Sequence, residues 1–309
     1  MRTRYDTSSA AMVMALALAG AVHAASPLPP DAAYVQEVAA WRAKADESLR
    51  RERGWLSMIG RWELQPGANR IGSAPGNDVR LPQALAPAEL ATIVVDRSTA
   101  RLSLAPGQKM FAVEDGGKGA EFSTREMVAG DRRVEWVTAG RLSLQVVRRE
   151  DGKFVLRAAD RDAPIRKTFP GRVWYDAKTD YKVPARFVPQ PKGTKIPIAN
   201  VRGEISYEEV AGYLEFTLDG ATVRLDALGD DDGDLFVIFR DATSEKTTYP
   251  PGRFLSIPKP KDGVWFVDFN KAYNPPCAFS AWTTCPLPPP QNWLKAEVRA
   301  GERYAGRKS

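Results

Sequence analysis

The last quarter of the sequence contains a dense set of polar and aromatic residues. Charged, amide and phenol side chains occur there among Phe, Trp and Pro in two stretches, FRDATSEKTTYPPGRF (239–254) and VDFNKAYNPPCAFSAWTTCPLPPPQNWL (267–294). Such neighbours leave polar side chains at least half buried, and buried polar groups need hydrogen-bond partners. The candidate ligand-binding residues are Arg240, Asp241, Tyr249, Arg253, Asp268, Asn270, Tyr273, Asn274 and Glu302.

These residue types are suited to a pocket for a small molecule or a component of the cell envelope. In such a pocket, Arg240 or Arg253 meets a carboxylate or phosphate of the ligand. Tyr249, Tyr273 or Trp282 then stacks on the ligand body. Ligand binding through this C-terminal region is the function that we predict from the sequence.

Two alternatives remain open. In a structural role, the same groups form an internal network, with Arg253 paired to Asp268 or Glu302, that joins the irregular C-terminal segment to a sheet. In a hydrolase, Asp241 or Asp268 is the general base or nucleophile and Tyr249 or Glu302 is the acid, because paired carboxylates perform acid–base chemistry without histidine. The sequence does not determine how far apart these carboxylates lie in the fold. Whether the protein is an enzyme therefore stays open.

The only histidine of the chain, His23, lies within a predicted signal peptide. A mature chain without imidazole excludes Ser-His-Asp and Cys-His sites and histidine-ligated zinc or iron. The sequence also has no nucleophile elbow, Walker loop or dinucleotide fingerprint. The acidic turn at Asp230, Asp231, Asp232 and Asp234 lacks the spacing of a helix-loop-helix calcium site, so we expect a solvated turn, with calcium as the alternative. We therefore expect no metal and no cofactor.

The N-terminus has the parts of a secretory signal. Arg2 and Arg4 form a basic region, the apolar stretch AMVMALALAG follows, and small residues precede a cleavage site after Ala24. The apolar stretch is shorter than the roughly 20 residues of a membrane-spanning helix, and no later segment approaches that length. We therefore expect an exported bacterial protein, periplasmic or secreted, without a membrane span in the mature chain.

Two cysteines, Cys277 and Cys285, lie in the proline-rich part of the motif region. In an oxidising compartment they are expected to form a disulfide. Closing a loop of this length contributes about 2.5 kcal/mol in the chain-entropy model. Two thiols are too few for a metal site and their spacing is not C-x-x-C, so free thiols are the main alternative.

The charge distribution bears on possible partners. The chain has a net charge of +6, and its basic residues are spread along the sequence with no run of five. Such a distribution is typical of a solvated surface, so we expect no nucleic-acid partner. A small-molecule or envelope ligand remains the expected partner, and the oligomeric state is left open.

Hydrophobic periodicity predicts an all-β protein with one N-terminal amphipathic helix. Residues 34–49 place apolar side chains at helical spacing after an N-cap at Asp31, and Gly54 ends the helix. From there the apolar residues alternate in short runs separated by turn residues, which indicates antiparallel sheets in a sandwich or barrel-like arrangement. The strongest signals are a meander at 133–157 and a hairpin around Asp219-Gly220.

Further strands are expected in the C-terminal half, including residues 172–175, 203–209, 213–218 and 296–299. Apolar periodicity is lost near residues 158–171, which predicts a division between two β units. The predicted organisation is a signal peptide (1–24), a helical segment (25–53), an N-terminal β unit (54–160) and a C-terminal β unit that carries the motif (161–309).

The motif region resembles a known bacterial family, domain of unknown function 1684. The most specific part is DFNKAYNPPCAF followed by TCPLPPPQN, and the similarity extends from about residue 34 to 304. It also includes GWL (54–56), NDVRLP (77–82), RVWY (172–175) and LEFTLDG (214–220). The resemblance implies an often exported bacterial protein and implies no particular activity.

A second, shorter resemblance concerns GANRIGSAPGNDVRLP (67–82), which is similar to the opening strands of a forkhead-associated phosphopeptide-binding module. That family uses an arginine directly after the strand glycine, and a later serine and histidine. Here Ser73 follows Gly72, and the mature chain lacks histidine. We therefore do not expect phosphothreonine recognition.

Overall fold

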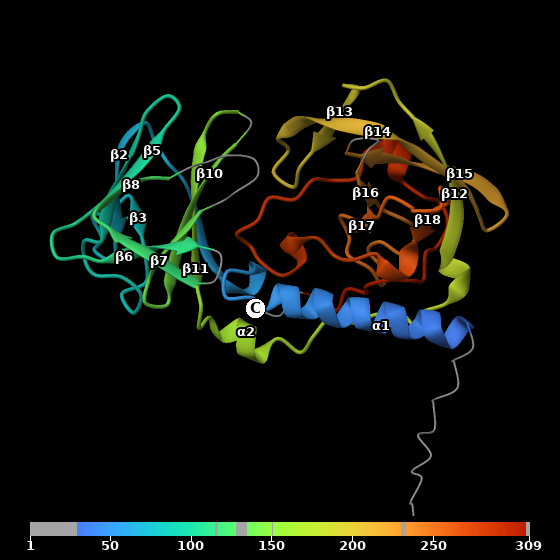
Figure 1. Ribbon diagram of the computed structural model, residues 1–309, viewed down its shortest axis with the longest axis horizontal. Coiled ribbons are helices and arrows are strands. Elements are labelled where there is room, and N and C mark those ends of the chain that lie inside the picture. The colour runs from blue at the N-terminus through green and yellow to red at the C-terminus, as the bar shows by residue number, and fades with distance from the viewer. Residues whose placement is uncertain (1–29, 115–116, 128–134, 150, 230–232, 307–309) are drawn as a thin grey trace, which may run out of the picture.

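A computed structural model describes residues 30–114, 117–127, 135–149, 151–229 and 233–306. The fold is mainly antiparallel β-sheet with one long N-terminal helix (Figure 1), which confirms the predicted fold class. The predicted signal peptide (1–24) and the acidic residues 230–232 lie outside the described residues. Among the residues that the structure describes, no helix is both long and apolar enough to cross a membrane.

Two sheets formed by residues 58–160 enclose the first hydrophobic core. Ile93 and Leu102 from one sheet and Leu144 and Leu156 from the other are buried in it. In strand order, the six-stranded sheet is β1 (Met58–Glu63), β11 (Phe154–Asp160), β10 (Leu142–Arg148), β9 (Trp136–Ala139), β6 (Met110–Glu114) and β7 (Gly117–Phe122). The five-stranded sheet is β3 (Val79–Arg80), β2 (Gly67–Gly72), β4 (Ala91–Val95), β5 (Ala100–Leu104) and β8 (Thr124–Glu126). The predicted meander is present as β9, β10 and β11.

A third sheet, nearly closed into a barrel, surrounds the second core. In strand order it contains β17 (Arg253–Ile257), β16 (Leu235–Phe239), β15 (Ala221–Leu228), β14 (Ile205–Leu218), β12 (Lys182–Pro189) and β18 (Trp265–Asp268), and β13 (Lys195–Ala199) pairs with β14. The strands of the two N-terminal sheets and those of the third sheet thus come from separate parts of the sequence. The boundaries at 25–53, 54–160 and 161–309 stay a prediction.

Strand β14 joins two segments that the alternation predicts as separate strands. Its register with β15 shifts between Val210 and Gly212, and such a bulge interrupts the alternation of apolar residues. At Gly212 a Cβ atom would lie 2.3 Å from the carbonyl oxygen of Val188 on β12, so the close approach of the strands requires glycine. The hairpin turn after β14 is confirmed, since Asp219 and Gly220 both have positive φ, at 51° and 79°.

Helix α1 (Pro30–Leu49) runs below the third sheet and ends beside the six-stranded sheet (Figure 1). Its residues Tyr34, Val38 and Leu49 are buried, which confirms the predicted apolar stripe. The helix therefore contributes to the packing of both halves of the chain.

Both ends of α1 differ from the prediction. The helix begins at Pro30, so Asp31 lies in its first turn instead of at the N-cap. It ends at Leu49, five residues before Gly54, and the chain then folds back on the helix end. A Cβ atom on Gly54 would lie 2.7 Å from the carbonyl oxygen of Leu49, so glycine permits this return rather than stopping the helix.

Two predicted C-terminal strands do not form. Residues 172–175 make only an isolated bridge between Trp174 and Glu302, and residues 296–299 are irregular. These segments satisfy their backbone groups through loops and side chains instead of a ladder. The short helices are η1 (Trp55–Ser57), α2 (Pro164–Thr168), η2 (Thr179–Tyr181), η3 (Phe269–Lys271), η4 (Pro276–Ala278) and η5 (Pro290–Asn292).

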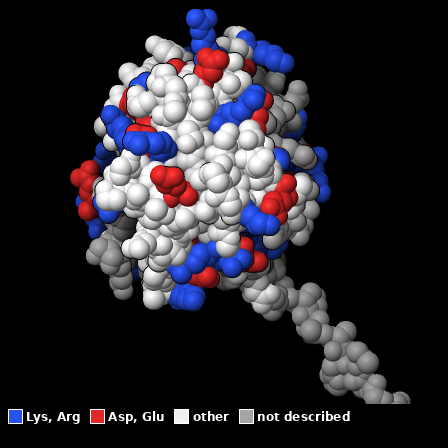
Figure 2. All heavy atoms as spheres, turned by 90° about the vertical axis from the view of Figure 1, so that its left-hand side faces the viewer, with Lys and Arg blue, Asp and Glu red and all other residues white. Residues whose placement is uncertain are grey.

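The predicted disulfide is confirmed. Cys277 and Cys285 are bonded, with their Cα atoms 6.2 Å apart. On the face formed by the two N-terminal sheets, lysine and arginine side chains are interspersed with aspartate and glutamate (Figure 2). This face therefore carries no extended region of a single charge sign.

Candidate functional site

Arg253 and Asp241 form an ion pair inside the C-terminal core. Arg253 is 1% exposed, and its Nη2 donates to Asp241 Oδ2 at 2.6 Å. The guanidinium also donates to the backbone carbonyls of Val298 and Ala300. Asp241 Oδ1 accepts hydrogen bonds from the backbone N–H and the hydroxyl of Thr243, at 2.7 and 2.5 Å. All of these groups are used within the protein, so the pair anchors residues 298–300 to the sheet.

The predicted pairing of Arg253 with Asp268 or Glu302 is therefore wrong. Arg253 lies opposite Phe239 in the β16–β17 register, and Asp241 follows two residues after Phe239. The strand pairing itself thus brings Asp241 next to the guanidinium. The internal network of the structural interpretation is present, but with this different partner.

Asp268 and Asn270 attach helix α1 to the third sheet. The hydroxyl of Tyr34 donates to Asp268 Oδ1 at 2.6 Å, and Asn270 Nδ2 donates to the Tyr34 oxygen at 2.9 Å. The Asn270 side chain also bonds both backbone groups of Lys178. Lys271 Nζ lies 3.3 Å from Asp268 Oδ2. Burial, followed by the hydrogen bond to Asp268, raises the pKa of Tyr34, so this phenol stays protonated.

Three further candidate residues contact other protein groups near the surface. Arg240 forms an ion pair with Glu245 at 2.9 Å. Tyr249 packs edge-on against Tyr304, with ring centroids 4.8 Å apart. Tyr273 packs against neighbouring aromatic rings. None of the three lines the cavity described next.

Two of the candidate residues, Asn274 and Glu302, meet Arg172 at a cavity of about 470 Å³, which no other candidate residue lines. Arg172 Nη1 donates to Glu302 Oε2 at 2.6 Å, and the backbone N–H of Asn274 donates to the same oxygen at 2.8 Å. Glu302 is 1% exposed. We call this space, with its lining residues from 56, 165–173, 274–279 and 302–306, the motif cavity.

The side-chain amide of Asn274 is only partly satisfied. Its Nδ2 donates to the carbonyl of Arg303 at 3.0 Å, which defines the orientation of the amide. Its Oδ1 is buried and accepts no hydrogen bond from the described residues. A buried acceptor without a partner is uncommon in native proteins and is costly when it stays unpaired.

The other walls of the motif cavity are mainly apolar. Phe169 and Phe279 pack edge-to-face with ring centroids 5.8 Å apart, and the Arg172 guanidinium lies 4.9 Å above the Phe279 ring. The remaining apolar side chains of the lining are Leu56, Ile165, Pro170, Val173, Ala278 and Ala305. A mainly apolar cavity with a few converging polar groups at one end is the usual form of a small-molecule site.

Glu302 is the titratable group of this cavity. Burial raises its pKa to about 7, although Arg172 and the Asn274 amide act in the opposite direction. Asp46, which lies 3.5 Å from Arg172 Nε, adds a smaller effect that also raises it. Glu302 therefore changes its protonation state near neutral pH, which is uncommon for a carboxyl group.

The disulfide closes the loop that carries part of the cavity wall. Ala278 and Phe279 lie between Cys277 and Cys285, and both line the motif cavity. Replacing both cysteines with alanine is expected to lower the free energy of unfolding by about 2.5 kcal/mol, because the unfolded chain gains loop entropy. Urea unfolding of the oxidised proteins measures this loss. A reductant should lower the stability of the wild type and leave the double variant unchanged.

Sequence reasoning did not select Arg172, Phe169, Phe279 or Tyr304 as site residues, although all line the motif cavity. Arg172 begins the RVWY stretch, where a cation beside Val, Trp and Tyr is a signal for a partly buried charge. This signal did not identify Glu302 as the partner, because the two residues are 130 positions apart.

The fold and cavity define a mainly β protein with a disulfide-closed C-terminal segment and a ligand-sized cavity behind it. The family model described as "Protein of unknown function (DUF1684)" matches residues 167–303. This match confirms the resemblance for the motif region, while the predicted similarity from about residue 34 to 166 lies outside the matched residues. The matched region contains the Arg172–Glu302 pair, the disulfide and most of the cavity lining.

Two solved structures are similar to parts of the chain. One is the solution NMR structure of an uncharacterized protein of Haloarcula marismortui, with 34% sequence identity over 45% of this chain and 78% of that chain, and a TM-score of 0.37. The other is the crystal structure of the FhaA FHA domain complexed with an intracellular domain, with 15% identity over 31% of this chain and 85% of that chain, and a TM-score of 0.21. These low TM-scores mean that neither similarity carries an argument about function. No curated protein matches the chain.

Proposed function

We propose that the protein binds a small, mainly apolar molecule with a hydrogen-bond donor in the motif cavity, as a ligand-binding protein of the cell envelope. The observation that carries this proposal is the buried, unpaired Oδ1 of Asn274 at the polar end of an apolar cavity. A hydroxyl or N–H group of a ligand would complete the hydrogen bonding of this oxygen.

The electrostatics of the cavity favour a ligand without net charge. The charge of Arg172 is balanced by Glu302 at 2.6 Å and by Asp46 at 3.5 Å, so the cavity offers an ionic group no uncompensated charge. Phe169 and Phe279 present ring surfaces to the rest of the ligand. Burial of apolar surface then supplies the affinity, and the hydrogen bond to Asn274 supplies the orientation.

A matched pair of probes tests the hydrogen bond. We expect 4-propylphenol to bind in isothermal titration calorimetry, and its methyl ether, 4-propylanisole, to bind about tenfold more weakly, because the ether cannot donate to Asn274. Equal affinities of the two probes would contradict the role of the amide. Absence of binding by both at millimolar concentration would contradict the binding function itself.

A pair of valine variants tests the location. Val173 lines the cavity and is 44% exposed, whereas Val94 on β4 is 46% exposed and lies outside it. Val173→Trp is expected to fill the cavity mouth and lower the affinity for 4-propylphenol at least tenfold, while Val94→Trp leaves it unchanged. If the two variants bind the probe equally well, the ligand binds elsewhere.

The hydrolase alternative has one supporting observation, the Glu302 carboxyl whose pKa of about 7 would suit a general acid. Among the described residues that line the motif cavity, Glu302 is the one carboxylate. Asp241 is held by Arg253 in the core, and Asp268 contacts α1. Because acid–base hydrolysis requires a second positioned group, ligand binding is the better supported function.

We also propose that the protein is exported. The basic, apolar and small-residue segments of the N-terminus support this proposal. The Cys277–Cys285 disulfide also supports it, since structural disulfides persist in oxidising compartments such as the periplasm. N-terminal sequencing of the protein from the periplasmic fraction should begin at Ala25. A protein that retains its first 24 residues in the cytoplasm would contradict export.

A further inference from the structure

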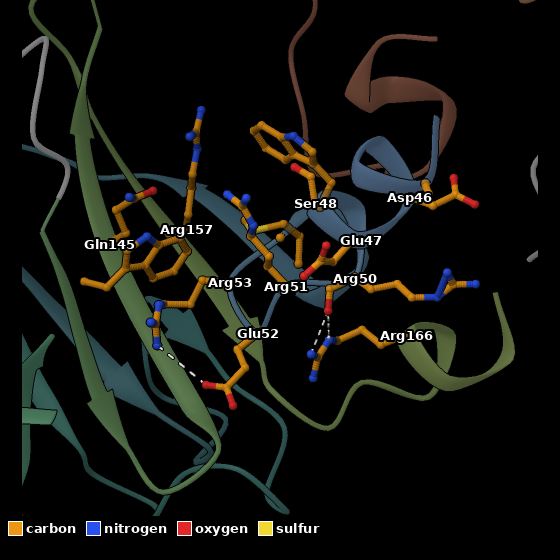
Figure 3. A pocket seen from close by; sticks show the side chains of 15 residues that line it. Asp46, Glu47, Ser48, Arg50, Arg51, Glu52, Arg53, Gln145, Arg157 and Arg166 are labelled. Atoms are coloured by element: carbon orange, nitrogen blue, oxygen red, sulfur yellow. Dashed lines mark hydrogen bonds and ion pairs between the residues drawn. The ribbon is translucent and has the colours of Figure 1, made fainter. Parts of the chain in front are cut away.

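A second and larger cleft, of about 1130 Å³, lies between the end of α1 and the six-stranded sheet. Figure 3 shows Gln145 and Arg157 on the strands at one side, with Glu47 on α1 and Arg166 on α2 at the other. Five arginines and three acidic residues line the cleft, together with two tryptophans. We call it the arginine cleft. The face in Figure 2 mixes both charge signs, so the arginines here are a local concentration.

One wall of the arginine cleft is a polar row across the sheet. Arg61 of β1 lies opposite Arg157 of β11, Arg157 lies opposite Gln145 of β10, and Gln145 lies opposite Trp136 of β9. Residues directly opposite in neighbouring antiparallel strands share one face of the sheet. The other face carries core residues such as Leu156, so the row faces away from the core; Arg157, Gln145 and Trp136 line the arginine cleft, and Arg61 lies outside its lining.

Gln145 is the most informative member of this row. It is 4% exposed, and its side-chain amide makes no hydrogen bond with the described residues. An amide carries one acceptor and two donors, and those of Gln145 are not among the buried unpaired atoms, so they remain accessible from the cleft. Because Gln145 lines the cleft, a ligand hydroxyl or carboxylate there would satisfy these groups.

Among the described residues, four of the five arginines have no carboxylate partner, and two of these, Arg51 and Arg157, also make no side-chain hydrogen bond. Arg157 Nε is buried without a hydrogen bond among the described residues, and its guanidinium lies 5.7 Å from the centre of the Trp55 ring. Burial, followed by repulsion from Arg61, lowers the pKa of Arg157, consistent with a cation that lacks an anion. Arg51 is exposed, and its guanidinium has no hydrogen bond or ion pair within the part of the chain that the structure describes.

The remaining charged groups of the cleft are already used or are weakly paired. Arg166 donates to the carbonyl of Arg50, and Arg50 donates to the carbonyl of Phe169. Arg53 is 3.8 Å from Glu52. These contacts shape the cleft and leave Arg51 and Arg157 as the groups that are free to bind an anion.

We propose that the arginine cleft binds a sugar that carries a carboxylate or phosphate. Arg51 and Arg157 hold the anionic group, because guanidinium groups form charge-assisted hydrogen bonds with these oxyanions. The half-buried indole of Trp55 or Trp136 packs against the apolar C–H face of the sugar ring, and Gln145 bonds a ring hydroxyl. This site uses none of the residues of the motif cavity, so the two proposals can fail separately.

Calorimetry with four probes tests the chemistry of the ligand. D-glucuronate or glucose 6-phosphate, or both, is expected to bind the full mature protein, and the comparison shows which oxyanion is preferred. Glucose tests the need for the anion, and inorganic phosphate tests the need for the ring. If neither sugar anion binds at millimolar concentration, the proposal is wrong. It is also wrong if glucose or inorganic phosphate binds as tightly as the better sugar anion.

Charge variants test the residues. Arg51→Gln and Arg157→Gln are each expected to weaken binding about tenfold or more, whereas Arg80→Gln, an exposed arginine on β3, should not change it. Glu47→Gln is expected to strengthen binding several-fold, because it removes a carboxylate from the cleft lining that would repel an anionic ligand. Since Arg51 is exposed, its variant keeps its fold even if the Arg157 variant does not. Unchanged affinity in Arg51→Gln, or weaker binding in Glu47→Gln, would overturn the assignment.

Discussion

Replacement of Arg253 with methionine is expected to lower the free energy of unfolding by about 3–5 kcal/mol. The change leaves the carboxylate of Asp241 without its cation in a fully buried position, where only the two hydrogen bonds from Thr243 remain. It also removes the bonds to the carbonyls of Val298 and Ala300. Urea unfolding at neutral pH measures the loss.

Two controls identify the cause of this loss. Arg240→Met removes an arginine whose ion pair with Glu245 is solvent-exposed, so it should cost less than about 1 kcal/mol. The double variant Arg253→Met with Asp241→Thr removes both charges and should recover much of the lost stability. If Arg253→Met is no more destabilising than Arg240→Met, the buried pair does not anchor the C-terminal segment.

The second large effect is expected for Glu302→Gln, and it depends on pH. The pKa of Glu302 rises from its ordinary value of 4.5 to about 7 in the folded protein, mainly because of burial. The folded state therefore holds this proton more strongly than the unfolded state. The stabilisation is fully present below about pH 4.5 and is lost as the pH rises through about 7.

A shift of this size corresponds to roughly 3 kcal/mol. Glu302→Gln removes the titration and keeps an acceptor for Arg172 and the Asn274 N–H. Relative to the wild type, the variant should therefore gain up to about 3 kcal/mol in stability between pH 4.5 and pH 7.5. Urea unfolding at several pH values in this window gives the difference, in which the other carboxylates cancel.

Glu297→Gln is the control, because this exposed carboxylate has a pKa lowered by its hydrogen bond with Arg299. Its stabilisation is present at higher pH and is lost on acidification, so its effect has the opposite sign. Parallel stability profiles of the wild type and Glu302→Gln would show that Glu302 titrates normally. The burial of the motif cavity would then be weaker than the structure indicates.

The two predictions separate the roles of residues that look alike in the sequence. Arg253 and Glu302 are both charged residues in the motif region, and both are 1% exposed. Arg253 donates three hydrogen bonds to partners within the core, so it stabilises the fold. Glu302 lines a cavity with an unpaired amide oxygen nearby, so it belongs to the candidate site.

The sequence by itself determined the features that depend on neighbours along the chain. Three predicted features are present in the structure. They are the helical stripe that includes Tyr34 and Val38, the Asp219-Gly220 hairpin and the Cys277–Cys285 bond. Each is encoded by residue types at short spacing, where the geometry of a helix, turn or loop sets the distance. Burial of most of the polar side chains of the motif was also predicted correctly, because Phe, Trp and Pro are their neighbours along the chain.

Only the tertiary structure decided which of those polar groups meet. The sequence offers several carboxylates as partners for Arg253, and it pairs with Asp241 because β16 and β17 are neighbours in the sheet. Arg172 pairs with Glu302, which lies 130 residues later in the chain. The row from Arg157 to Trp136 in the arginine cleft likewise exists only through strand register. Such pairings depend on how distant segments pack, and many alternative pairs have the same chemistry, so residue types and spacing do not select among them.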